Sequence, residues 1–240
     1  MNARDLQTRL RSLANPADAA FLAGFFKTGP GEYGAGDVLI GVRVPVIRKL
    51  ATEFKSLGPL SEIERLLHSK VHEARLAALI ILVMQFAEAG PATRKASYHL
   101  YLANTALVNN WDLVDVSAPH VVGGFLADKS RRPLDRLARS AWLWDRRISL
   151  LATFHFIRRG QFADTLRIAE LLLADPHDLI HKAAGWMLRE VGKRDVRALE
   201  RFLARHGPSM PRTMLRYAIE RFPADRRNEF LAAGTDCNSV

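Results

Sequence analysis

Four side chains between positions 111 and 186 have types and spacing that could do chemistry. Trp111 and Asp115 are four residues apart, which places them on one face of a helix, and Arg147 and Trp186 follow later. A carboxylate stabilises developing positive charge, and tryptophan faces do the same. A carboxylate between two aromatic faces, with an arginine beside it, is therefore typical of a site. Taken singly, each residue has another interpretation, since tryptophan is often buried and Asp115 could be ion-paired in a packed helix.

Basic and aromatic residues recur at nearly equal intervals along the chain. Arg75, Trp111, Arg147, Lys182 and Arg216 are separated by 36, 36, 35 and 34 residues. Each begins a predicted helix that is the second of a pair. In a helical solenoid the second helices line one surface, usually the concave one, so we expect these five side chains to form a row there. Coincidence in an arginine-rich helical chain is the alternative interpretation.

Helical spacing of apolar residues predicts the elements that position these side chains. Residues 6–13 predict a first helix, residues 21–26 a second and residues 63–67 a short later one, and strand alternation is almost absent. Residues 28–44 are the exception, because five glycines and one proline interrupt any periodicity before Pro45 opens a helix. Prolines near the other predicted helix starts require short connections, and they stand at Pro59, Pro91, Pro133, Pro176, Pro208 and Pro223.

The sequence thus predicts an all-α solenoid of stacked antiparallel helix pairs. We expect a single helical domain over residues 1–234 of the 240. Within it, the N-terminal helices and the glycine-rich loop occupy residues 1–58, and the repeats occupy residues 59–234. Residues 235–240 form a polar tail.

The charge is unevenly distributed. The chain has 35 Lys+Arg against 25 Asp+Glu, a net charge of +10. Residues 1–120 hold 13 basic and 11 acidic groups (+2), and residues 121–240 hold 22 and 14 (+8). Arginine accounts for 27 of the 35 basic residues, and its planar fork matches phosphate oxygens. A polyanionic partner is therefore the first expectation.

Composition excludes several classes of protein. With 48% hydrophobic and 25% charged residues, the chain can build a soluble core without disulfides or metal. Cys237 is its one cysteine, which rules out a disulfide framework and favours a reducing, cytoplasmic location. No apolar run reaches the roughly 18 residues of a membrane span, and because the first residues include acids and lack an apolar core, we expect no signal peptide. The histidine pairs His68/His72 and His177/His181 lack a third ligand, so we expect no metal.

Four segments follow one another in an order shared with a known family. They are Leu39–Arg48, Asn110-Trp-Asp-Leu-Val-Asp115, Trp144-Asp-Arg-Arg147 and Lys182-Ala-Ala-Gly-Trp186-Met-Leu-Arg-Glu190. Together they resemble the AlkD-type DNA alkylation repair proteins, over about residues 35–222. The resemblance implies HEAT-like repeats that hold duplex DNA in a basic concave cleft. It also implies a monofunctional DNA glycosylase that releases cationic alkylpurines such as 3-methyladenine and 7-methylguanine.

The resemblance also assigns residues. The lesion-site roles fall on Trp111, Asp115, Arg147 and Trp186, while Asn110 stands where the family often has an aromatic residue. We expect no cofactor, no obligate protein partner and a monomer. DNA contacts are expected from Arg43, Arg48, Arg75, Lys182, Arg189 and Arg216.

The chemistry of alkylpurines fits so small a set of groups. Glycoside hydrolysis generally takes two carboxyl groups, because the leaving oxygen must be protonated. A purine alkylated at N3 or N7 already carries positive charge and leaves neutral, so one carboxylate suffices. A lyase step would require a lysine that forms a Schiff base. Two alternatives stay open: a DNA-binding repeat protein without catalysis, and a scaffold for an acidic protein.

Overall fold

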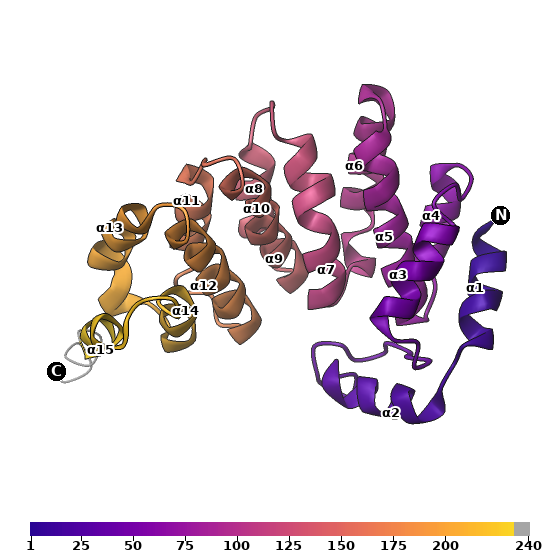
Figure 1. The fold of residues 1–240 in the computed structure, drawn as a ribbon, viewed down its shortest axis with the longest axis horizontal. Coiled ribbons are helices and arrows are strands. Elements are labelled where there is room, and N and C mark those ends of the chain that lie inside the picture. Colours follow the sequence, from indigo (N-terminus) through magenta and orange to yellow (C-terminus); the bar gives the residue numbers. More distant parts are fainter. Residues whose placement is uncertain (233–240) are drawn as a thin grey trace. The chain divides into compact units, whose positions relative to one another are not determined.

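The all-α prediction is confirmed. The structure, a computed structural model, describes residues 1–232, and within that range the only strand-like pairing is an isolated bridge between Val38 and Val71. The chain divides into two compact units, Met1–Phe125 and a second that begins at Leu126 (Figure 1). The expected polar tail, with Cys237, lies outside the described residues.

The first unit opens with helices whose starts are set by side-chain caps. Asn2 and Asp5 form a reciprocal capping box at α1, and Asn15 accepts hydrogen bonds from the first-turn amides of α2. The predicted helices over 6–13, 21–26 and 63–67 correspond to α1, α2 and α4. The helices of this unit are α1 (Ala3–Ser12), α2 (Pro16–Phe25), α3 (Val44–Glu53), α4 (Leu60–Leu67), α5 (His72–Glu88), α6 (Pro91–Ala103), α7 (Trp111–Ala118), the short 3-10 helix η1 (Thr105–Leu107) and the π-helix η2 (Pro119–Gly123).

Helix α5 is the centre of this unit. Most of its residues are buried, and it packs against α1, α3, α4, α6 and α7. Its sequence is apolar almost all round, as a helix enclosed by others requires. The first turn of α5 is buried as well, and its His72 and Arg75 contact polar groups of the loop and of α7.

The predicted glycine-rich loop is confirmed, and it is packed rather than loose. Gly41 has φ +83°, and a Cβ there would lie 2.0 Å from the Asn15 carbonyl oxygen. The Val38 amide donates to the Lys70 carbonyl, and the His72 amide donates to the Val38 carbonyl. The loop is therefore held between the start of α2 and the start of α5.

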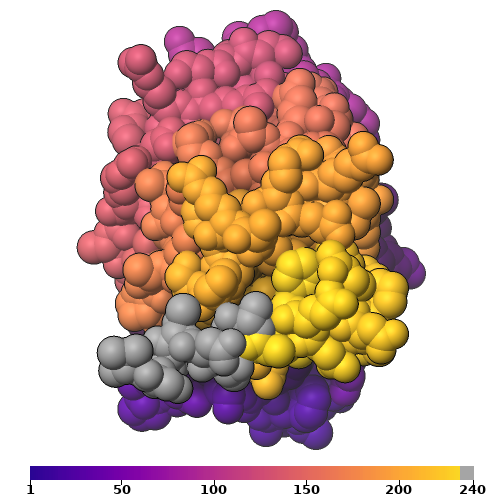
Figure 2. Space-filling model, turned by 90° about the vertical axis from the view of Figure 1, so that its left-hand side faces the viewer, coloured from indigo at the N-terminus to yellow at the C-terminus, as the bar shows by residue number. Residues whose placement is uncertain are grey.

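The second unit consists of further stacked helices. Helix α12 packs against α9, α11, α13 and α14, and its inner residues are buried. The bounds are α8 (Arg132–Ala138), α9 (Leu143–Ala152), α10 (Phe154–Ile157), α11 (Ala163–Leu171), α12 (Asp178–Gly192), α13 (Val196–His206), η3 (Gly207–Ser209), α14 (Arg212–Ala218) and α15 (Ala224–Ala232). Figure 2 faces the C-terminal end of this unit, where α13 and α15 lie at the surface.

The period predicted from the sequence marks real helix starts. Its five positions fall in α5, α7, α9, α12 and α14, each within the first five residues. The expected row of surface side chains is wrong at two of them. Arg75 and Arg147 are only 4% and 5% exposed, because the side of the helix on which they lie faces protein and not solvent.

Candidate functional site

The first unit contains a pocket of about 520 Å³ lined by both Trp111 and Asp115. The two residues lie one turn apart on α7, as their spacing predicted. The other walls come from α2, the loop, α3 and α5, and they are mostly apolar. The lining residues are Leu22, Phe25, Phe26, Leu39, Val42, Arg43, Val44, Pro45, Ile47, Arg48, His72, Glu73, Leu76, Trp111, Asp112, Asp115 and Val116.

Trp111 is held by aromatic neighbours at the C-terminal end of α2, Phe25 in its last turn and Phe26 as its C-cap. The Phe26 ring stacks on it at 5.3 Å between centroids, with 29° between the planes, and the Phe25 ring meets it edge-on at 5.7 Å. Asn110, fully buried, caps α7 by accepting from the Trp111 amide. The indole therefore has a fixed place in the pocket wall, with Asp115 one turn further on.

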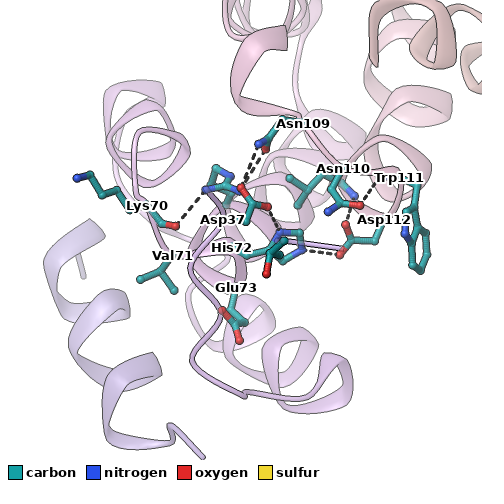
Figure 3. A network of polar contacts seen from close by, with 12 residues as sticks. Asp37, Lys70, Val71, His72, Glu73, Asn109, Asn110, Trp111 and Asp112 are labelled. Atoms are coloured by element: carbon teal, nitrogen blue, oxygen red, sulfur yellow. Dashed lines mark hydrogen bonds and ion pairs between the residues drawn. The ribbon is translucent and has the colours of Figure 1, made fainter. Parts of the chain in front are cut away.

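A buried polar network includes His72 and Asp112 of the pocket lining (Figure 3). His72 Nδ1 lies 2.9 Å from a carboxylate oxygen of Asp37, and its Nε2 lies 2.8 Å from one of Asp112. Asp37 also accepts hydrogen bonds from Arg75 Nη2 at 2.6 Å and from Asn109 Nδ2 at 3.0 Å. The network thus joins the glycine-rich loop, α5 and the first turn of α7.

The charges of this network shift the pKa values of His72 and Asp37. Burial lowers the pKa of His72, but the charge and hydrogen bonds of Asp112 and Asp37 outweigh burial and raise it to about 9. For Asp37, burial raises the pKa, and the contacts with His72, Arg75 and Asn109 bring it below its usual value. Opposite charges at hydrogen-bond distance explain both directions. At neutral pH the site therefore holds an ionised Asp37 and a protonated His72.

Glu73 holds the loop by its backbone. Its Oε1 accepts hydrogen bonds from the amides of Ile40 at 2.9 Å, Gly41 at 2.8 Å and Val42 at 3.3 Å. Three successive amides around one carboxylate form an anion-binding nest, here filled by the protein's own side chain. This contact fixes the loop beside the pocket, just before the chain enters α3.

The other predicted lesion-site residues lie in the second unit. Trp186 is partly exposed on α12, with its ring 6.1 Å from that of Phe154, over which Arg158 sits at 4.2 Å. Arg147 is buried and donates to the Leu179 carbonyl. The hydrogen bond to Leu179 is a structural contact, and the lesion-site role of Arg147 stays a prediction.

The predicted DNA-contact residues differ in accessibility. Arg75 is buried in the network, so it cannot reach a phosphate and that prediction is corrected. Lys182 pairs with Asp178 at 2.7 Å, and both side chains remain accessible. Arg189 pairs with Glu220. The remaining three, Arg43, Arg48 and Arg216, are exposed, and Arg43 and Arg48 also line the pocket.

Sequence reasoning missed the partners that come from other elements. Phe25 and Phe26 were interpreted only as helix residues, and His72 was considered only as a metal ligand. In sequence, Phe25 and Phe26 lie 85 or more positions before Trp111 and His72 lies 39 positions before it, so no local pattern connects them. Among residues 1–232, no cluster of three or more His, Cys, Asp or Glu could hold a metal ion. None of the helices in that range is both long and apolar enough to cross a membrane.

Comparisons with known proteins identify the family. The sequence model described as "DNA alkylation repair enzyme" matches residues 6–222, whereas no curated protein matches the chain by sequence. Among solved structures, a predicted DNA alkylation repair enzyme from Enterococcus faecalis superposes with a TM-score of 0.69 at 17% identity. The superposition covers 88% of this chain and 97% of that one, so the two share a fold. Since the family model spans most of the sequence, the chain belongs to the DNA alkylation repair enzyme family.

Proposed function

We propose that the protein is a monofunctional DNA glycosylase that hydrolyses the N-glycosidic bond of cationic alkylpurines in duplex DNA. The observation that supports this most directly is the pocket shared by Trp111 and Asp115. A carboxylate beside an aromatic wall of Phe25, Phe26 and Trp111 is suited to a positively charged ligand. Family membership supports a role in alkylation repair, and the pocket contains the carboxylate and the indole on which the proposed reaction depends.

The reaction needs few groups. The bond between C1′ and the purine nitrogen breaks, and its electron pair neutralises the positive charge of the alkylated base. The sugar develops positive charge, which the Asp115 carboxylate stabilises. Water then adds to C1′ and gives up a proton, with the Asp115 carboxylate as the acceptor. Trp111 excludes bulk water from one side and offers its π face to the developing cation.

The absence of a lysine from the pocket lining supports a hydrolytic step alone. Among the described residues that line the pocket, the cations are Arg43, Arg48 and His72, and none of these forms a Schiff base with a sugar. Arg43 and Arg48 are suited to backbone phosphates, which give sequence-independent affinity. Trp186, Lys182 and Arg216 remain proposed contributions of the second unit.

Release of the base from defined DNA tests the proposal. The substrate is a duplex with one 7-methylguanine, and the assay measures free base by chromatography and DNA binding by fluorescence anisotropy. Asp115→Asn should bind DNA like the wild type and release base about 100- to 1,000-fold more slowly, as expected when an electrostatic stabiliser is lost. Asp128→Asn is the matched control, because Asp128 is exposed in a loop.

The outcomes separate the alternatives. Full activity of Asp115→Asn would contradict the role of this carboxylate. A wild-type protein that binds the duplex but releases no base would instead support the non-catalytic DNA-binding alternative. If the wild-type protein did not bind DNA, the remaining alternative would be a helical-repeat scaffold that binds an acidic protein.

A further inference from the structure

We propose that His72 is a positioning residue for the Trp111–Asp115 pocket and that it acts as an imidazolium that ties the glycine-rich loop to α7. The importance of the pocket rests on the proposed function, whereas the tie itself rests on contacts in the structure. His72 is 1% exposed, so it acts on a substrate only through the residues that it holds.

Between two ionised carboxylates, both ring nitrogens must donate. Nδ1 lies 2.9 Å from Asp37 Oδ2, and Nε2 lies 2.8 Å from Asp112 Oδ2. An ionised carboxylate only accepts hydrogen bonds, and a neutral imidazole has a single N–H. Both contacts are therefore made together only by the protonated ring. The neutral ring would keep one of them and lose the other.

The charged groups around His72 support the same form. Asp37 faces it from the loop and Asp112 from α7, while Arg75, from the same helix α5, approaches Asp37 from the other side. Together these pairs hold the pKa of His72 at about 9 despite its burial. Glu73 follows in the chain, but its Oε1 and Oε2 accept from loop amides. The other charged residues of the same pocket lining are Arg43, Arg48 and Asp115.

The Phe26 ring contacts both His72 and Trp111, so it connects His72 to the pocket wall. The centroid of the Phe26 ring lies 4.9 Å from that of the His72 imidazole and 5.3 Å from that of the Trp111 ring. Asp112, the acceptor of the Nε2 contact, is the residue directly after Trp111 and lies in the first turn of α7. Loss of the Asp112 contact would therefore loosen the helix start and the indole stack together. Asp115, one turn later, depends on the same helix start.

Fluorine NMR tests the tie without any need for base release. The protein is labelled with 5-fluorotryptophan, and Trp111→Phe assigns the Trp111 resonance among those of Trp142, Trp144 and Trp186. As pH rises from about 7 to about 10, the wild-type Trp111 resonance should shift with a midpoint near the His72 midpoint of about 9. The His72 ring protons, followed in proton–carbon spectra, should titrate at that same midpoint.

Three variants make the test specific. In His72→Gln the pH-dependent shift of Trp111 should disappear. In His68→Gln it should persist, because His68 is an exposed histidine of the same unit, at the end of α4. Asp112→Asn keeps the size of the side chain, so it serves if His72→Gln does not fold. It should lower the His72 midpoint towards the ordinary value of 6.5, and the Trp111 midpoint should fall with it.

Activity adds a second readout. With the 7-methylguanine duplex, His72→Gln should lower the rate of bound-state base release by about 10- to 100-fold while the affinity for DNA stays nearly unchanged, as expected of a misplaced reacting group. The inference would be overturned if the Trp111 resonance did not shift as His72 titrates, or if the His72 midpoint lay near 6.5. If the wild type released no base, the proposed function would fail, and the NMR titration would still decide whether His72 positions Trp111.

Discussion

At the scale of single residues, Asp37 is the carboxylate of the buried network that joins His72, Arg75 and Asn109. It pairs with His72 and Arg75 and accepts from Asn109, and its pKa lies below the usual value. A carboxyl group with a lowered pKa contributes stability that is present above its unfolded pKa. That stability is lost as pH falls through the lower, folded value. Asp37 therefore makes the first unit sensitive to acid.

The variant Asp37→Asn tests this acid sensitivity. At about pH 7 it should lower the free energy of unfolding by about 3–5 kcal/mol, because it removes the carboxylate partner of the buried Arg75 and leaves His72 with Asp112 alone. At about pH 3 the difference from the wild type should be smaller, since this pH lies below the ordinary carboxyl pKa of 3.8, where the stability that comes from the lowered pKa of Asp37 is already being lost. Urea denaturation at the two pH values measures this. Asp128→Asn should match the wild type at both, and a pH-independent difference for Asp37→Asn would contradict the expectation.

The sequence predicted those site residues that one helix turn brings together. Trp111 and Asp115 share a pocket because four-residue spacing on a helix is a local property. Asp37, His72 and Phe26 could not be placed there, because three different segments must pack before they meet. Arg75 was misinterpreted because periodicity gives the position along a helix, but not whether a charged side chain meets solvent or a buried carboxylate.

At the scale of elements, the glycine-rich loop is fixed by its backbone. Gly41 has φ +83°, and a Cβ would lie 2.0 Å from the Asn15 carbonyl oxygen and 2.6 Å from the Ala19 amide nitrogen. Both contacts are with backbone at the start of α2, which cannot turn away as a flexible side chain would. The same segment donates its amides to Glu73. Position 41 thus sets how closely the loop and α2 approach.

Alanine substitutions separate the backbone angle from the close approach. Gly36→Ala is the matched control, since Gly36 also has a positive φ of 89° but nothing lies within 4 Å of a Cβ there. We expect Gly36→Ala to cost about 1 kcal/mol through the backbone angle alone. Gly41→Ala should cost at least roughly twice as much, because a steric clash adds to the angle. Urea denaturation measures both, and equal losses would contradict the close packing at Gly41.

The elements themselves were predictable where local signals are strong. The prolines located helix starts, and the glycines of residues 28–44 located the loop. Within the described residues, the helix period also found the beginnings of α5, α7, α9, α12 and α14. The pairing of the loop with α5 through Val38 and Val71 was not predictable, because it depends on tertiary contacts and no repeated sequence pattern accompanies it.

At the scale of the whole molecule, the net charge of +10 divides between the two units. No charged residue lies between positions 121 and 125, so the first unit, residues 1–125, carries +2 and the remainder carries +8. Lys182 and Arg216 stand at the fifth position of α12 and α14, two helices that pack side by side in the second unit. Both side chains are accessible at the surface. Such a pair is suited to neighbouring phosphates of one DNA strand.

The salt dependence of DNA binding measures this contribution. The logarithm of the binding constant should fall linearly with the logarithm of salt concentration, by about 0.9 for each phosphate contact. Lys182→Gln and Arg216→Gln should each make that slope shallower by about 1 and weaken binding to any duplex sequence alike. Arg201→Gln is the control, because Arg201 is exposed on α13, a helix outside the row of second helices. If all three variants kept the wild-type slope, the phosphate contacts would lie elsewhere. If only Arg201→Gln changed it, DNA would bind the opposite helices of the repeats, since in stacked helix pairs the first and second helices line different faces.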